Sequence, residues 1–164
     1  MGYSVRISKY RNTIVANNLH SGFRIHLRKL VNLTHIILKK LKYTDVILSL
    51  VFVSDAQMKQ LNRKFLNHSW ATDVLAFPFS GFTGHQPLPS YYFFMGEVIV
   101  SPKRAKVYAA RFKIPFEEEF VRYICHGILH LKGYSDHSTR KKKQMRHIED
   151  QLLNRLGPGI RGVI

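Results

Sequence analysis

The sequence predicts an α+β fold, a single compact domain in which a small mixed β-sheet packs against about five helices. The length of 164 residues fits one domain, and a hydrophobic content of 45% is sufficient for a core. Short β-branched segments alternate with longer segments of helical periodicity, which is typical of mixed folds. We expect the domain to cover residues 1–156 and residues 157–164 to form a short C-terminal tail.

The first four elements are indicated by alternation, helical spacing and a capping pair. Residues 3–8 alternate like a first strand, and an apolar stripe at helical spacing predicts a basic amphipathic helix near 22–41. Residues 46–53 form an apolar, β-branched run that predicts a buried strand. A Ser-Asp pair is a favourable start for a short helix over 54–65.

The second half of the chain is predicted to be mainly helical. Two strand candidates, 72–79 and 97–100, are separated by a loop that contains Gly and Pro. A Ser-Pro pair opens a helix over 101–112. The next helix, 115–133, begins with Pro and a run of Glu, whose charge suits the positive end of a helix. A serine can cap the last helix, 138–156, which Gly-Pro-Gly ends.

Charge and cysteine content indicate the kind of partner and the compartment. The formal net charge of +16 favours a polyanionic partner, with nucleic acid as the first candidate. No apolar run approaches the roughly 20 residues of a membrane-spanning helix, so we expect no membrane association. Cys125 is the only cysteine, which excludes an internal disulfide and fits a reducing compartment. We therefore expect a cytoplasmic protein without a disulfide-linked partner, in which Cys125 is a buried apolar residue rather than a nucleophile.

The most informative segment carries His126 and His130, four residues apart in a helical run. Side chains at this spacing lie on the same face of a helix, where two imidazoles can bind one ion. Asp136 and His137 follow just after Gly133 and offer a third donor. Two neutral imidazoles suit zinc first, and three protein ligands plus water make an open, catalytic site. The sequence therefore predicts a divalent transition metal, most consistent with zinc, at the end of this helix.

A site of this kind supports hydrolysis, because bound zinc lowers the pKa of water from about 15.7 towards 7. The catalytic group would then be the metal-bound water. In zinc peptidases of the H-E-x-x-H type a Glu follows the first His, and here that position is Gly127. The pattern therefore predicts a metal site and argues against a peptidase.

Clusters of Lys and Arg are candidates for contact with phosphates. They comprise Arg24, Arg28, Lys29, Lys39, Lys40 and Lys42, and the run Arg140, Lys141, Lys142 and Lys143. On a less basic chain these would be read as solvated helix faces. The aromatic residues 91–94 could stack on bases, although packing in a strand is the more usual role for such a run.

The sequence also resembles the YbeY family of metal-dependent endoribonucleases that mature ribosomal RNA. The family pattern H-G-x-L-H-L-x-G-Y-D-H reads HGILHLKGYSDH over residues 126–137. An Asn-containing helix and a T-D-V-L-S-F-P block correspond to 61–65 and 72–78, and G-D-I-x-I-S corresponds to 96–101. These blocks cover about residues 46–150. The resemblance implies an α+β domain with a zinc-like ion that cleaves single-stranded RNA in ribosomal RNA maturation and ribosome quality control, with ribosomal subunits as partners.

The third ligand is where the chain departs from the family pattern. The family has a His six residues after the second His, and that register gives Asp136 here, with His137 one residue further on. Ser135 is an insertion if the Gly133 turn absorbs it, which leaves His137 as the ligand. If Ser135 is not an insertion, Asp136 completes a set of two His and one carboxylate. Both assignments stay open at this point.

A second departure concerns the groups that assist catalysis. Many family members have an Arg where this chain has Leu66, so Arg63 or His68 is the candidate for phosphate contact instead. Glu97 and Asp73 are candidates for proton transfer, although a structural role is the more common one for such carboxylates.

We therefore expect a metal-dependent endoribonuclease that acts on ribosomal RNA. The alternative is a metal-stabilised assembly factor that binds RNA or the ribosome without hydrolysis. A zinc peptidase ranks third.

Overall fold

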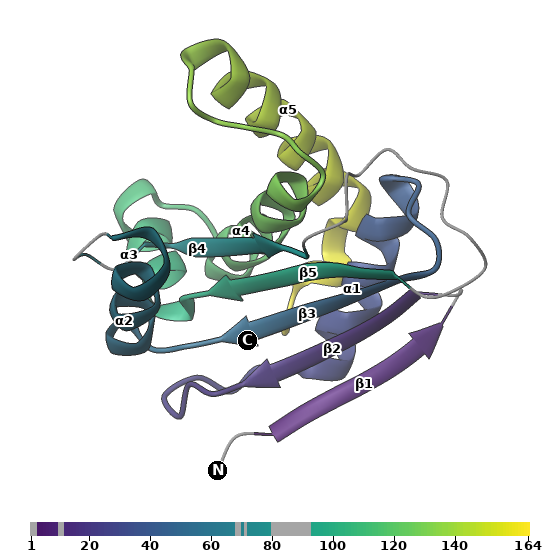
Figure 1. Cartoon of the computed structure of the whole chain (residues 1–164), viewed down its shortest axis with the longest axis horizontal. Coiled ribbons are helices and arrows are strands. Elements are labelled where there is room, and N and C mark those ends of the chain that lie inside the picture. The colour runs from purple at the N-terminus through teal and green to yellow at the C-terminus, as the bar shows by residue number, and fades with distance from the viewer. Residues whose placement is uncertain (1–2, 10–11, 68–69, 71, 80–92) are drawn as a thin grey trace.

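The computed structural model describes residues 3–9, 12–67, 70, 72–79 and 93–164. These residues form one twisted β-sheet with helices packed on it (Figure 1). Helices α1 and α4 contact the sheet and pack into its main core, and α5 lies on α4 on the side away from the strands. The α+β class expected from the sequence, with a small mixed sheet, is therefore confirmed.

The sheet has the strand order β1-β2-β3-β5-β4. Its strands are β1 (Tyr3–Lys9), β2 (Asn12–Asn18), β3 (Val46–Phe52), β4 (Val74–Pro78) and β5 (Phe93–Val100). The central pairs, β2 with β3 and β3 with β5, are parallel, and the outer pairs, β1 with β2 and β4 with β5, are antiparallel. The sheet is therefore mixed, with β4 beside the helix that carries the histidines.

Three of the α-helices begin after a serine that caps them. The helices are α1 (Leu27–Lys40), α2 (Asp55–Leu66), α3 (Pro102–Phe112), α4 (Phe116–Leu131) and α5 (Thr139–Leu156), followed by the 3-10 helix η1 (Gly157–Ile160). Ser54, Ser101 and Ser138 each accept a hydrogen bond from the backbone N–H three residues on, which satisfies one of the free donors at a helix start.

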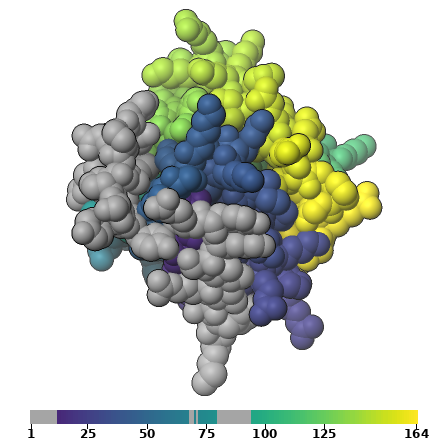
Figure 2. Space-filling view, turned by 90° about the vertical axis from the view of Figure 1, so that its right-hand side faces the viewer, coloured from purple at the N-terminus to yellow at the C-terminus, as the bar shows by residue number. Residues whose placement is uncertain are grey.

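The main core lies between the sheet and helices α1 and α4. Strand residues such as Leu48, Leu50 and Val98 are fully buried there. The end of the chain joins this core, because Val163 is fully buried and its carbonyl accepts a hydrogen bond from the N–H of His26 at 2.8 Å. Figure 2 shows the C-terminal residues beside α1. The boundary at residue 156 stays a prediction, and the described residues beyond it pack against the domain.

Most predicted elements agree with the structure, with three corrections. Strand β2 was not predicted, because NTIVANN reads as polar although Ile14 and Ala16 face the core. Helix α1 begins at Leu27 rather than near residue 22, where His26 caps it through its side chain. Strand β5 begins at Phe93, earlier than expected. None of the described helices combines the length and apolar composition needed to cross a membrane.

Candidate metal centre

Helix α4 presents His126 and His130 on the face that turns away from the core. The rest of this helix is mostly buried, and both histidines are partly exposed, at 25% and 29% of their side chains. Gly127, next to the first His, packs directly on strand β5: a Cβ here would lie 2.4 Å from Cγ1 of Val98. A side chain at this position, such as the Glu of a zinc peptidase, would require the helix or the strand to shift.

The two imidazoles face each other through their Nε2 atoms, which are 2.9 Å apart. Nδ1 of His130 faces the carbonyl oxygen of Tyr134 at 3.0 Å, and Nδ1 of His126 faces Oε1 of Glu149 at 2.8 Å. A carbonyl and a carboxylate only accept, so both Nδ1 atoms carry the proton. When both rings are neutral, both Nε2 atoms present lone pairs to one another. A bound cation stabilises such an arrangement, and two imidazole nitrogens directed at one place are a donor pair that a transition metal can use.

Asp136 completes the group of donors. Its Oδ2 lies 4.0 Å from Nε2 of His126, and its Oδ1 lies 3.9 Å from Nε2 of His130. One ligand atom from each of the three residues lies within 4.8 Å of the others. The turn that follows α4 makes this possible, because Gly133 adopts φ +91°, a conformation that favours glycine and reverses the chain.

The surroundings of His130 favour the neutral form of its ring. Burial, together with the neighbouring His126, holds the pKa of His130 below its ordinary value. The ring of His130 is therefore neutral at physiological pH, which is the form that coordinates metals. Two imidazole nitrogens and one carboxylate oxygen form a donor set that suits zinc and related transition metals.

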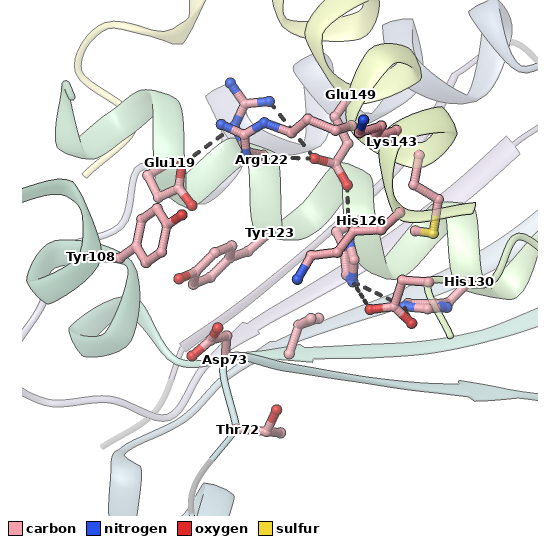
Figure 3. A pocket seen from close by; sticks show the side chains of 15 residues that line it. Thr72, Asp73, Tyr108, Glu119, Arg122, Tyr123, His126, His130, Lys143 and Glu149 are labelled. Carbon is pink, nitrogen blue, oxygen red and sulfur yellow. Dashed lines mark hydrogen bonds and ion pairs between the residues drawn. The ribbon is translucent and has the colours of Figure 1, made fainter. Parts of the chain in front are cut away.

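The metal centre lies in a cavity of about 720 Å³ (Figure 3). The cavity is bounded by the residues before β4, by α3, and by α4 and α5. Besides the three donors its lining includes Thr72, Asp73, Tyr108, Glu119, Arg122, Tyr123, Lys142, Lys143, Arg146 and Glu149. A space of this volume is ordinary for a small-molecule or nucleotide-sized site.

One wall of the cavity carries Asp73 and Tyr123 beside each other (Figure 3). Burial raises the pKa of Asp73 above its ordinary value. Burial and the neighbouring carboxyl of Asp73 likewise raise the pKa of the Tyr123 hydroxyl. Asp73 is thus a carboxyl that exchanges a proton more readily near neutral pH than a solvated one does.

The basic residues predicted to contact RNA fall into two groups. Lys142 and Lys143 are exposed and line the cavity, whereas Arg140 and Lys141 are exposed on the same helix outside its lining. The second group lies in and around α1, away from the cavity lining, and comprises Arg24, Arg28, Lys29, Lys39, Lys40 and Lys42.

The other candidate residues are dispersed. Arg63 is exposed on α2 and does not line the cavity. Glu97 accepts a hydrogen bond from Ser49 on the sheet at 2.7 Å. His137 is exposed and lies outside the donor group found among the described residues. His68 falls outside the described residues, as do positions 91 and 92 of the aromatic run.

Two further candidates have clear surroundings. Leu66 is 49% exposed at the end of α2. Cys125 is fully buried, and burial raises the pKa of its thiol, which makes it a poor nucleophile.

Sequence reasoning missed the charged residues behind the metal centre. Arg122 and Glu149 are 5% and 4% exposed, and the nearer oxygen of Glu149 contacts His126. A signal was present for Glu149: it shares the spacing of the apolar stripe of α5, with Met145 and Leu152 on either side. A charged residue on the buried stripe of an amphipathic helix needs a partner, and His126 is that partner.

Comparison with known proteins agrees with the motifs. The sequence profile described as Endoribonuclease YbeY matches residues 15–157. An endoribonuclease YbeY of Thermodesulfovibrio yellowstonii is 37% identical over 115 residues, which is 69% of each chain. That of a Sulfurihydrogenibium species is 30% identical over 148 residues, covering 89% of this chain and 93% of the relative.

A solved structure supports the same relationship. The solution structure of a Thermotoga maritima protein superimposes with a TM-score of 0.57 at 28% sequence identity. The match covers 82% of this chain and 89% of that protein. Profile, relatives and structure cover most of the chain, including the metal-centre residues 126–136 within the profile match. The chain belongs to the endoribonuclease YbeY family.

Proposed function

We propose that this protein is a metal-dependent endoribonuclease that cleaves single-stranded RNA, with ribosomal RNA as its substrate and ribosomal subunits as partners in the cytoplasm. The observation that carries the proposal is the pair of Nε2 atoms, 2.9 Å apart, at the floor of a cavity whose wall carries lysines. The family supplies the endonuclease activity. The donor group supplies a place for the metal.

His126, His130 and Asp136 are the proposed metal ligands. The placement of the Asp136 carboxylate beside both imidazoles favours it over His137, which is exposed. Zinc is the proposed metal, because nitrogen and oxygen donors in an open site of three protein ligands suit it. When bound, such an ion supplies Lewis acidity towards the scissile phosphate and a water of lowered pKa.

The lysines on the wall of the cavity would hold and orient the RNA. Lys142 and Lys143 can contact phosphates on either side of the cleaved bond, because they are exposed on the wall above the metal ligands. Arg140 and Lys141 would continue this track along α5, and the basic residues around α1 would contact more distant parts of the RNA. Arg63 is a less favourable candidate, because it does not line the cavity.

Asp73 is the proposed proton-transfer group. It lines the cavity, and burial raises its pKa above the ordinary value. It lies beside the Tyr123 side chain on the same wall (Figure 3). Glu97 is not a candidate for this step, because its carboxylate is engaged with Ser49 on the sheet.

One observation favours the alternative function, an RNA- or ribosome-binding assembly factor without hydrolysis. Leu66 stands where many members of the family have an Arg, and it is exposed and apolar here. A peptidase is disfavoured, because Gly127 packs against Val98 and a catalytic Glu there would require the helix or the strand to shift.

The test is cleavage of a labelled single-stranded RNA and of the matched duplex, with and without a chelator. The proposal expects chelator-sensitive cleavage of the single strand, lost in His126→Ala. His147→Ala is the matched control, since His147 is an exposed histidine on α5 that bonds Gln151. Intact RNA in every reaction together with tight RNA binding would support the assembly factor. Chelator-sensitive cleavage of casein would support the peptidase.

A further inference from the structure

Three charged side chains are buried behind the metal centre, where they take no part in the proposed hydrolysis. Arg122, Glu119 and Glu149 are 5%, 2% and 4% exposed. Removing charges from water is costly, and replacing a buried ion pair by apolar residues is often neutral or stabilising. Stability alone is therefore a weak reason for this cluster between α4 and α5.

The two oxygens of the Glu149 carboxylate have different partners (Figure 3). Oε1 accepts a hydrogen bond from Nδ1 of His126 at 2.8 Å. Oε2 lies 3.7 Å from Nη1 of Arg122 and 3.9 Å from Nη1 of Arg146. The two guanidinium groups hold one oxygen, so the other remains directed at the imidazole.

Arg122 is itself held by several carboxylates. Its Nη2 lies 3.2 Å from Glu118, its Nε lies 3.3 Å from Glu119, and Nη1 donates to Asp150. These contacts come from both α4 and α5, so the guanidinium has little freedom to move away from Glu149. The cluster therefore holds the Glu149 carboxylate in one orientation, with Oε1 directed at His126.

We propose that Glu149, held by Arg122, is a positioning residue that keeps His126 in its Nδ1–H tautomer and thereby sets the metal affinity of the site. A carboxylate at Nδ1 leaves Nε2 unprotonated, directs it at the other donors and raises its basicity. For His130 the same task falls to the backbone carbonyl of Tyr134, which no side-chain substitution removes. This inference rests on the ligand set of the proposed function and is independent of RNA cleavage.

Metal affinity is the first measurement, by titrating zinc against a chromophoric chelator. Glu149→Ala should weaken binding by about 10–100-fold, the range typical of groups that hydrogen-bond a ligating His. Glu149→Gln keeps the shape and one acceptor but loses the charge, so its loss should be smaller. Glu117→Gln is the matched control: it removes a carboxylate charge on the same helix α4, where Glu117 accepts a hydrogen bond from the N–H of Gly162. Its affinity should equal that of the wild type.

The tautomer is the second measurement, by nitrogen-15 NMR of the imidazoles in the metal-free protein. The wild type should show a protonated Nδ1 at His126, and Glu149→Ala should show the proton shifted towards Nε2. Glu149→Gln provides the folded variant if Glu149→Ala fails to fold. Wild-type metal affinity and an unchanged tautomer in either folded variant, with only the unfolding temperature lowered, would overturn the inference. Metal retained in His126→Ala would instead refute the ligand set of the proposed function.

Discussion

The floor and the wall of the cavity differ in how far their side chains are buried and fixed by hydrogen bonds. On the floor, His126, His130 and Asp136 are partly buried, and each imidazole has its Nδ1 fixed by an acceptor. On the wall, Lys142 and Lys143 are exposed near the start of α5. A floor of this kind depends on the position of individual atoms, whereas a wall of exposed lysines depends on the sum of its charges.

The two regions also differ in the sign of their charge. The chain has 26 Lys and Arg against 10 Asp and Glu. Half of these acids gather at the floor or directly behind it, namely Glu118, Glu119, Asp136, Glu149 and Asp150. One cavity can therefore attract a cation to its floor and a polyanion to its wall. Substitutions in the two regions should have different consequences.

The largest effect is expected at Asp136, the proposed third ligand. Asp136→Ala should lower zinc affinity by more than the 10–100-fold typical of groups that only orient a ligand, because a direct donor is lost. His137→Ala should leave affinity nearly unchanged, since His137 is exposed and outside the donor group. Competition with a chromophoric chelator measures both. The reverse order would assign His137 as the ligand, and equal retention in both would mean that the site contains another donor.

The next largest effect concerns the contribution of the buried Arg122 to the stability of the protein. Arg122→Met removes the cation that faces Glu119 at 3.3 Å and leaves Glu149 with Arg146 as its remaining guanidinium partner. Breaking a buried pair in this way costs about 3–5 kcal/mol of unfolding free energy, which lowers the unfolding temperature by about 10 °C in a chain of this size. Calorimetry measures the change. Lys103→Met is the control, because that Lys is exposed and pairs at 3.7 Å with Asp55.

The destabilisation of Arg122→Met should also depend on pH. Burial already raises the pKa of Glu119, and loss of the neighbouring cation raises it further. A carboxyl with a raised folded-state pKa favours the folded protein while it is protonated, and this contribution is lost as the pH rises through that pKa. The deficit of the variant relative to the wild type should therefore be larger at pH 7 than near pH 5. A deficit that grows on acidification would contradict this reading.

A smaller effect is expected where α4 meets the sheet. In Gly127→Ala the new Cβ would lie 2.4 Å from Cγ1 of Val98, so helix or strand must shift. Overpacking of this kind costs about 1–3 kcal/mol. Gly159→Ala is the control, because its Cβ would meet Leu33 at 3.4 Å. Chemical denaturation should give a lower unfolding free energy for Gly127→Ala than for Gly159→Ala. Equal unfolding free energies would mean that the helix can shift away from the strand at no cost.

Much of the fold follows from the sequence because its signals are local. Helix α5 begins after the predicted cap Ser138, and strand β3 coincides with the β-branched run. The i, i+4 spacing likewise placed His126 and His130 on one face, since helix geometry fixes it. Strand β2 was missed because its inward alternation is diluted by Asn at both ends.

The place of Asp136 beside the two histidines and the buried charges around Arg122 could not be predicted, because they depend on how segments of the chain fold against one another. The conformation of the turn at Gly133 decides whether Asp136 or His137 reaches the imidazoles, and spacing alone leaves both possible. The contact of Glu149 with His126 joins residues 23 positions apart on two helices. It exists only because α5 packs on α4 in one register.

The smallest effect per residue is expected at the wall. Each phosphate contact on single-stranded RNA contributes about 0.7 to the slope of log affinity against log salt. The double variant Lys142→Gln with Lys143→Gln should therefore reduce that slope by about 1.4, while zinc content stays at the wild-type level. Fluorescence anisotropy of a labelled RNA, titrated from low to high salt, measures the slope.

The comparison pair for the wall is Lys39→Gln with Lys40→Gln at the end of α1, which removes the same charge outside the cavity lining. If the wall guides RNA to the metal centre, the α5 pair should also slow cleavage at saturating RNA, because a strand held elsewhere is poorly aligned. The α1 pair should weaken binding at most, and its cleavage at saturation should match the wild type. Equal effects of the two pairs on both measurements would mean that the protein binds RNA through its overall charge, and that the floor alone selects the bond that is cleaved.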